Sequence, residues 1–250
     1  MLLNEIIQNK HLEIEALRSQ NFDLARVPPA RKFLAKNTFS LIAEVKKASP
    51  SAGILQPNYD PAQLAREYEK AGASAISVLT DAKYFQGSLE DLKKVKAAVN
   101  LPVLCKDFIM DERQILAARA FGADAVLLIE RILNKNDLCH FLEIVHNLNM
   151  QALVEVHTQH ELEKVLNSKA QIIGINNRDL DTLKIDLNTS FSLCKEFRKE
   201  LKDRILVSES GIRNREDAKA LKKSGFNAIL VGESILKSKS PGQAIKDLLA

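Results

Sequence analysis

The chain has 250 residues, of which 46% are hydrophobic and 5% aromatic, and it carries a formal net charge of +4. The length suits a single domain, and a small charge without a basic block interleaved with aromatics argues against a nucleic-acid-binding surface. The start MLLNEIIQNK lacks the features of a signal peptide, and no apolar run approaches the ~18 residues of a spanning helix, so we expect no membrane association. The cysteines, Cys105, Cys139 and Cys194, show no CxxC spacing, which favours free thiols in a reducing cytoplasm over a disulfide framework or a metal site.

An amphipathic helix is predicted at the N-terminus. Apolar residues recur at nearly helical spacing over residues 1–20, with a polar face opposite them. Pro28 and Pro29 then end any helix, because proline cannot continue one. We therefore interpret residues 1–38 as a helical extension that precedes the main body of a single domain, residues 1–250.

Strand-like and helix-like segments alternate along the rest of the chain. Strands are expected at 39–46, 74–80, 102–106, 124–129, 151–156, 171–176, 205–209 and 227–232, each followed by a helix, with starts near Pro61, Leu89, Asp111, Lys135, Thr158, Thr189, Arg215 and Pro241. The first of these connections, 47–60, reads as a long loop rich in Ser, Pro and Gly. Such alternation predicts an α/β protein, a (β/α)8 or TIM barrel with parallel strands and the N-terminal helical extension.

Polar residues stand where several of the expected strands end. These residues are Glu44, Lys46, Lys106, Glu155, Asn176 and Glu209. The carboxyl ends of barrel strands meet at one mouth, so we expect these side chains to share a pocket. An unpaired buried charge costs several kcal/mol or more, which predicts that the lysines pair with the glutamates. Ion pairs that merely stabilise the rim are the alternative, but a rim does not need five charges and an amide to converge.

Two glycine-containing turns follow the last two expected strands. Ser210-Gly211 and Gly232-Glu233-Ser234 lie where barrels commonly bind phosphate, because glycine lets the backbone approach an anion. Ordinary tight turns are the alternative. Arg178 and Ser49 add donors suited to anionic oxygens, so we expect a ligand with at least one phosphate, and we consider a carboxylate as well.

Other residues carry weaker signals. We interpret His157 and His160 as the surface start of a helix, because no metal-binding pattern surrounds them, and Cys105 as a packed thiol that faces outward. The chain has no GxGxxG, Walker A or nucleophile-elbow motif.

Six ordered motifs resemble those of the indole-3-glycerol-phosphate synthase family. They are EVKKASPS (44–51), KDF (106–108), VEVH (154–157), INNRDL (175–180), SESGI (208–212) and VGES (231–234), and with the N-terminal extension they cover almost the whole chain. The resemblance implies a TIM-barrel lyase of tryptophan biosynthesis. Such an enzyme converts 1-(2-carboxyphenylamino)-1-deoxyribulose 5-phosphate to indole-3-glycerol phosphate, CO2 and water, with no metal or organic cofactor.

The resemblance also implies roles for individual residues. Lys106 matches the general acid at the substrate carbonyl, and Glu155 a carboxylate that stabilises charge on the anilino nitrogen or acts in the dehydration. Lys46 matches a second lysine near the substrate carboxylate. The remaining matches are Glu44 and Asn176 as orienting residues, Glu209 as a further carboxylate, Ser49 and Arg178 as ligand donors, Phe85 and Leu127 as apolar walls, and Ser210, Gly211, Gly232 and Glu233 as the phosphate cradle. Glu233 is a departure, since many relatives carry a small serine there; turned inward, its side chain would weaken phosphate binding.

Three other functions are kept as alternatives: a related phosphosugar barrel such as phosphoribosylanthranilate isomerase or the tryptophan synthase α subunit, a Schiff-base aldolase using Lys106, and a binding barrel without turnover. For the chain itself we expect a monofunctional monomer that takes an anionic phosphosugar and can associate with other enzymes of its pathway.

Overall fold

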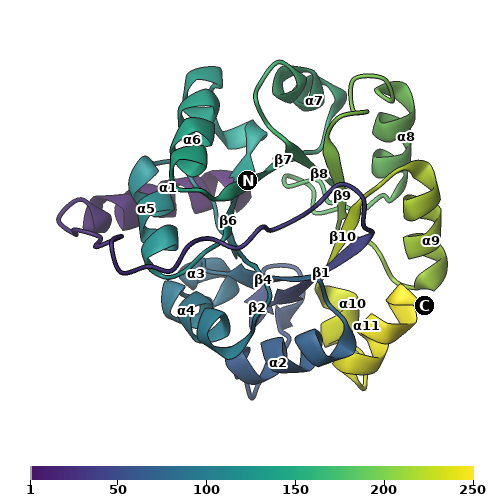
Figure 1. Ribbon diagram of the computed structural model, residues 1–250, viewed down its shortest axis with the longest axis horizontal. Coiled ribbons are helices and arrows are strands. Elements are labelled where there is room, and N and C mark those ends of the chain that lie inside the picture. The colour runs from purple at the N-terminus through teal and green to yellow at the C-terminus, as the bar shows by residue number, and fades with distance from the viewer. Residues whose placement is uncertain (1) are drawn as a thin grey trace.

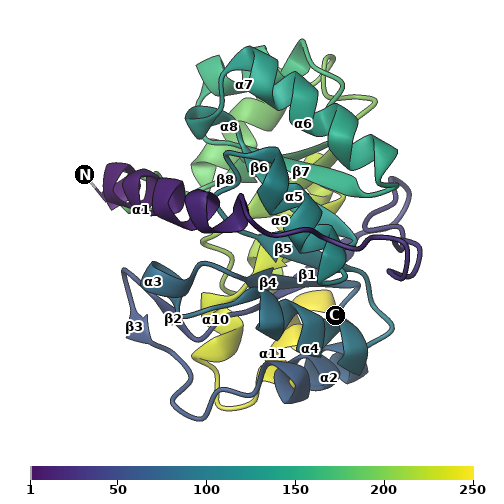
Figure 2. The same cartoon turned by 90° about the vertical axis from the view of Figure 1, so that its left-hand side faces the viewer.

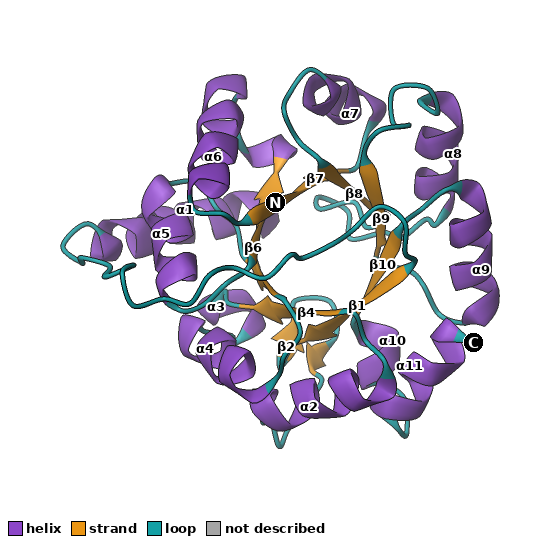
Figure 3. Cartoon of the chain, viewed as in Figure 1, coloured by secondary structure: helices purple, strands orange, loops and turns teal. Residues whose placement is uncertain are grey.

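Eight parallel strands close into a barrel in the computed structural model of the protein, which describes residues 2–250 (Figure 1, Figure 3). In order around the barrel they are β1 (Ser40–Val45), β4 (Ala75–Leu79), β5 (Val103–Lys106), β6 (Ala125–Ile129), β7 (Gln151–Val156), β8 (Ile172–Asn176), β9 (Ile205–Glu209) and β10 (Ala228–Val231). Neighbours in the barrel are also neighbours in the sequence, and β10 closes on β1. The predicted (β/α)8 barrel is thus confirmed.

Helices form a ring around the strands (Figure 3). They are α2 (Pro61–Ala71), α4 (Leu89–Ala98), α5 (Glu112–Ala120), α6 (Lys135–Asn147), α7 (Gln159–Leu166), α8 (Asn188–Glu196), α9 (Arg215–Ser224) and α11 (Pro241–Leu249), with the single turn α10 (Glu233–Leu236) after β10. Asp60, Asp111 and Thr158 accept hydrogen bonds from the backbone of the first turn, as N-cap residues do. Over residues 2–250, no helix is both long and apolar enough to cross a bilayer.

Side chains alternate between two apolar layers, as strand geometry requires. Leu104 and Leu153 belong to the cluster inside the barrel, whereas the adjacent Cys105 and Val154 belong to the layer between strands and helices. The outward orientation predicted for Cys105 is confirmed. Residues at the ends of the strands that share the register of Leu104 and Leu153 therefore point toward the barrel mouth.

Short elements that the sequence did not predict occupy the loops after the strands. The segment interpreted as a long loop contains an antiparallel hairpin, β2 (Ala48–Ser49) with β3 (Gly53–Ile54). A one-turn helix, α3 (Ala82–Phe85), follows β4, and a 3-10 turn, η1 (Glu130–Ile132), follows β6. Elements this short leave no periodic pattern in a sequence.

The N-terminal segment contacts both ends of the barrel. The first turns of α1 (Leu2–Leu17) lie at the carboxyl ends of the strands, near α3 and the hairpin, and the chain then runs to the opposite end before entering β1 (Figure 2). There the backbone amides of Arg31 and Phe33 donate to Asp124 and Gln151, 2.7 and 2.6 Å away. Phe33 packs into the barrel interior from that end, and Leu3 of α1 is buried at the other.

Candidate active site

A cavity of about 360 Å³, which we call the main cavity, opens at the carboxyl ends of the strands. Among the predicted site residues, Glu44, Lys46, Phe85, Lys106, Leu127, Glu155, Asn176, Arg178, Ser210, Gly211, Gly232 and Glu233 line it. Ser49 lines an adjoining smaller space of about 90 Å³, the side cavity, which shares Lys46, Phe85 and Arg178 with the main one. Glu209 does not line either cavity, but it contacts Lys106. The structure therefore brings the predicted residues to one end of the barrel.

The charged groups at the strand ends form contacts with one another. Lys106 Nζ lies 3.4 Å from Glu155 Oε2 and 3.2 Å from Glu209 Oε2, while Lys46 Nζ lies 2.6 Å from Glu44 Oε1. Asn176 Nδ2 donates to the other oxygen of Glu155 at 3.0 Å. The predicted pairing of lysines with glutamates is present, and it holds both lysine head groups against the cavity.

Burial and neighbouring charges shift the pKa values of this cluster. Burial alone lowers the pKa of Lys106, but Glu209 and Glu155 together raise it above its usual value, so the lysine stays protonated. Burial, reinforced by the charge of Glu155 and opposed by Lys106, raises the pKa of Glu209 to about 8. Apart from the contact of Oε2 with Lys106 Nζ, no group of residues 2–250 donates a hydrogen bond to the Glu209 carboxylate. The site thus pairs a charged lysine with a carboxyl that gains or loses a proton near neutral pH.

Two glycines leave room for the buried carboxylates. A side chain at Gly174 would collide with Glu209 Oε1, and a Cβ at Gly232 would come within 2.5 Å of Glu44 Oε1. These positions in β8 and after β10 must stay small so that the carboxylates fit into the barrel mouth.

The two glycine-containing turns lie side by side on the cavity wall. Ser210 and Gly211 adopt left-handed conformations, with φ of 66° and 81°, which turns the chain sharply after β9. Gly232 precedes α10 and offers no side-chain cap. The first backbone amides of α10 are therefore left for a ligand or water. Glu233 turns toward the cavity, where its carboxylate pairs with Arg178 at 3.2 Å and with Lys237 at 2.6 Å.

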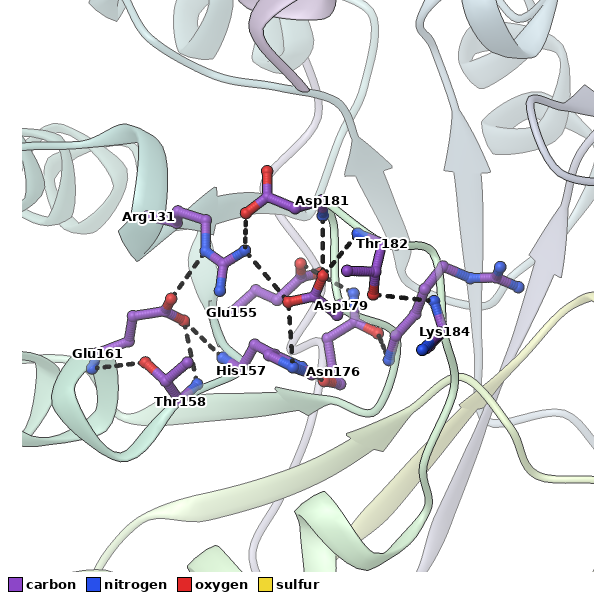
Figure 4. Close-up of polar contacts among 11 residues, drawn as sticks. Arg131, Glu155, His157, Thr158, Glu161, Asn176, Asp179, Asp181, Thr182 and Lys184 are labelled. Atoms are coloured by element: carbon purple, nitrogen blue, oxygen red, sulfur yellow. Dashed lines mark hydrogen bonds and ion pairs between the residues drawn. The ribbon is translucent and has the colours of Figure 1, made fainter. Parts of the chain in front are cut away.

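A second set of contacts supports the site from the side of β7 and β8 (Figure 4). The His157 ring bonds the backbone carbonyl of Asn176 through Nδ1 at 2.6 Å and faces Asp179 through Nε2 at 3.5 Å. Asp179 in turn lies 3.5 Å from Arg131, which also pairs with Glu161 at 2.8 Å. The interpretation of His157 as a surface residue was wrong: it is mostly buried and ties the loop after β8 to the end of β7. His160 is exposed, as expected.

Sequence reasoning missed several residues of the two cavities. Asp107 and Phe108 belong to the KDF motif but were assigned no role, although both line the main cavity. Leu2, Leu3 and Ile6 of α1 line the side cavity. Their apolar stripe was visible in the sequence, but nothing indicated which end of the barrel it would cover. The positive side chains of Arg213 and Lys237, also in the main cavity, carried no sequence signal beyond their charge.

Comparison with known proteins places these features in a family. A family model described as indole-3-glycerol phosphate synthase matches residues 3–248. The chain is 45% identical to the indole-3-glycerol phosphate synthase of Trichodesmium erythraeum, over 99% of this chain and 88% of that protein. It is 48% identical to that of Carboxydothermus hydrogenoformans, over 86% of this chain and 81% of the relative. Among solved structures, a 3-hexulose-6-phosphate synthase superposes with a TM-score of 0.66 at 16% identity, covering 84% of this chain and 97% of that one, which supports the fold alone.

Proposed function

This chain belongs to the indole-3-glycerol phosphate synthase family, and we propose that its main cavity carries out the reaction for which that family is named. The reaction closes, decarboxylates and dehydrates 1-(2-carboxyphenylamino)-1-deoxyribulose 5-phosphate to indole-3-glycerol phosphate, a step of tryptophan biosynthesis. The observation that carries the proposal is the position of Lys106, a charged lysine held between Glu155 and Glu209 at the floor of an anion-sized cavity.

The substrate spans the cavity in one orientation. Its phosphate lies at the turns of Ser210, Gly211 and Gly232, where backbone amides can donate to it. Its aromatic ring lies between the apolar walls formed by Phe85 and Leu127. Between these ends the ketone carbon of the sugar chain comes next to Lys106, which lines the same cavity.

Ring closure needs an acid at the ketone. As the ring carbon that bears the carboxylate attacks the ketone carbon, Lys106 donates a proton to the ketone oxygen, which becomes a hydroxyl group. The attack places positive charge on the anilino nitrogen, and the carboxylate of Glu155 stabilises it. Loss of CO2 then returns an electron pair to the ring and restores its aromaticity.

Dehydration completes the indole. The new hydroxyl leaves as water after a second protonation, and a carboxylate removes a proton from the adjacent ring carbon, so that one C–O and one C–H bond break and one C=C bond forms. Glu155 is the carboxylate that removes the C–H proton. Glu209, 3.2 Å from Lys106, can return a proton to the lysine after ring closure. Lys46 binds the substrate carboxylate, and Glu44, 2.6 Å from Lys46 Nζ, orients this lysine.

Four further properties belong to the same proposal. The enzyme works as a cytoplasmic monomer, consistent with its scattered free cysteines, and it can associate with other enzymes of the pathway. Residues 1–250 form one domain, of which residues 1–38 are the N-terminal extension.

The direct test is to add the carboxyphenylamino-ribulose phosphate to the purified protein and follow indole fluorescence. A rise in fluorescence with release of one CO2 per indole supports the proposal, and its absence over a range of pH rejects it. Borohydride treatment during turnover separates this reaction from an aldolase, because only a Schiff base on Lys106 would be trapped covalently.

A further inference from the structure

Lys10 of α1 is a buried cation at the carboxyl end of the barrel. Its side chain is 1% exposed, and its Nζ lies 2.6 Å from Asp107 Oδ1, 2.9 Å from Asp81 Oδ2 and 2.6 Å from Glu13 Oε2. We call these four residues the Lys10 cluster. Burial alone lowers the pKa of Lys10, but Asp107 and Asp81 raise it above its usual value, so the group remains charged.

Each aspartate of the cluster is attached to a wall of the side cavity. Asp107 accepts a hydrogen bond from the backbone amide of Phe108 at 2.8 Å. Asp81 accepts one from Tyr84 at 2.7 Å as the N-cap of α3, the turn that ends at Phe85. The rings of Phe85 and Phe108 lie 6.3 Å apart and line both cavities.

The third wall belongs to α1 itself. Ile6 and Leu3, one turn and two turns before Lys10, line the side cavity and are buried. Lys10 therefore joins the helix that covers this space to the two aromatic rings that flank it.

Separating Lys10 of α1 from Asp81 and Asp107 is energetically unfavourable. Asp81 is fully buried, and within residues 2–250 neither Asp81 nor Asp107 has another ion-pair partner. If α1 moved away, two carboxylates would be left without their cation in a site of low polarity, which is strongly unfavourable.

We propose that Lys10 is a positioning residue for the aromatic half of the substrate: by binding Asp81 and Asp107 together, it fixes α1 against Phe85 and Phe108, and Phe85 is one of the two walls proposed for the aromatic ring. This inference rests on the proposed function. The position of Lys106 does not depend on the Lys10 cluster, because the contacts of Lys106 with Glu155 and Glu209 fix it. Loss of Lys10 therefore weakens substrate binding more than it slows the chemical step.

The test is Lys10→Met, which removes the charge and keeps the length of the side chain. We expect KM to rise about tenfold with kcat reduced less than about threefold, since misplaced binding walls lose affinity before they lose chemistry. The matched control is Lys96→Met. Lys96 pairs with Asp124, which binds the backbone of Val103 at the other end of β5, and it lines neither cavity.

Hydrogen exchange gives a readout that does not require turnover. Lys10→Met should speed exchange in α1, in α3 and at Phe108 together, whereas Lys96→Met should not. Asp81→Asn, which keeps the N-cap oxygen but loses the charge, should reproduce both effects more weakly and guards against poor folding of Lys10→Met. Unchanged KM, or faster exchange confined to α1, overturns the role of Lys10. Failure of the wild-type protein to form indole would instead overturn the proposed function.

Discussion

At the amino end of the barrel, the buried carboxylate of Asp124 is bonded to Lys96 Nζ and to the backbone amides of Arg31 and Val103. At the carboxyl end, Glu209 is buried to the same degree, yet within residues 2–250 its carboxylate has one donor contact, with Lys106 Nζ. Both are acids in an apolar interior, and both have a lysine within 3.2 Å.

The two acids differ in how many hydrogen-bond donors contact their carboxylate oxygens. Three donors contact the Asp124 carboxylate, so this side chain joins Lys96, β5 and the N-terminal segment. Glu209 has one such contact, with Lys106, and burial together with the charge of Glu155 outweighs it and raises the pKa of Glu209 to about 8. Full satisfaction gives stability, and incomplete satisfaction gives a group that can exchange protons during a reaction.

The largest expected effect comes from removing the charged lysine of the mouth. Lys106→Ala should lower kcat by about 10²–10⁴-fold, the range that a positioned general acid contributes. Circular dichroism should show the same secondary structure, because Lys106 ends its strand and packs no core layer. A variant that keeps wild-type turnover would remove Lys106 from the mechanism.

At the amino end of the barrel, we expect a substitution to lower stability and to leave turnover unchanged. Asp124→Ala should lower the free energy of unfolding by about 3–5 kcal/mol, because Lys96 loses its partner and the backbone amides of Arg31 and Val103 lose their acceptor. Urea unfolding measures this loss. At a temperature where the variant is folded, its kcat should match that of the wild type; a parallel fall in kcat would mean that the two ends are coupled.

Glu209 should also make the free energy of unfolding depend on pH. The pKa of Glu209 is raised by burial to about 8, so between roughly pH 4.5 and 8 the folded chain holds a proton that the unfolded chain has released. The free energy of unfolding therefore falls as pH rises through this window, by up to about 1.4 kcal/mol per pH unit. Glu209→Gln should flatten that slope when urea unfolding is repeated across the range. Identical slopes in both proteins would show that Glu209 is ionised throughout.

Much of this architecture was predictable because it depends on short-range rules. Helix starts at Asp60, Asp111 and Thr158 follow from the hydrogen bonds that these side chains offer to the first turn. Glu155 and Asn176 could be assigned to one pocket because strand alternation and parallel closure place all inward-facing strand ends at the same mouth. The hairpin β2–β3 and the helix α3 could not be predicted, since they depend on contacts with the rest of the mouth and not on local periodicity.

Lys10 shows what a closer reading of the sequence could have found. It lies on the same helical stripe as Leu3, Ile6 and Ile14, all of which are buried. A lysine within a buried stripe needs a carboxylate partner, so the stripe predicts a buried ion pair. Which carboxylates supply it could not be predicted, because Asp81 and Asp107 reach Lys10 only once the barrel has closed.

The smallest expected effect concerns the proposed phosphate-binding side of the main cavity, where the Glu233 carboxylate forms ion pairs with Arg178 and Lys237 when no substrate is bound. Its contacts with Arg178 and Lys237 at 3.2 and 2.6 Å must weaken if a phosphate is to use those groups. Glu233→Ser should therefore lower KM by about threefold at low ionic strength, with a smaller effect at high salt because exposed charges are screened. Glu143→Ser makes the same change in net charge at a surface residue paired with Lys169, outside both cavities, and should leave KM unaltered. A higher KM in Glu233→Ser would mean that Glu233 aligns Arg178 for the substrate instead of competing with it.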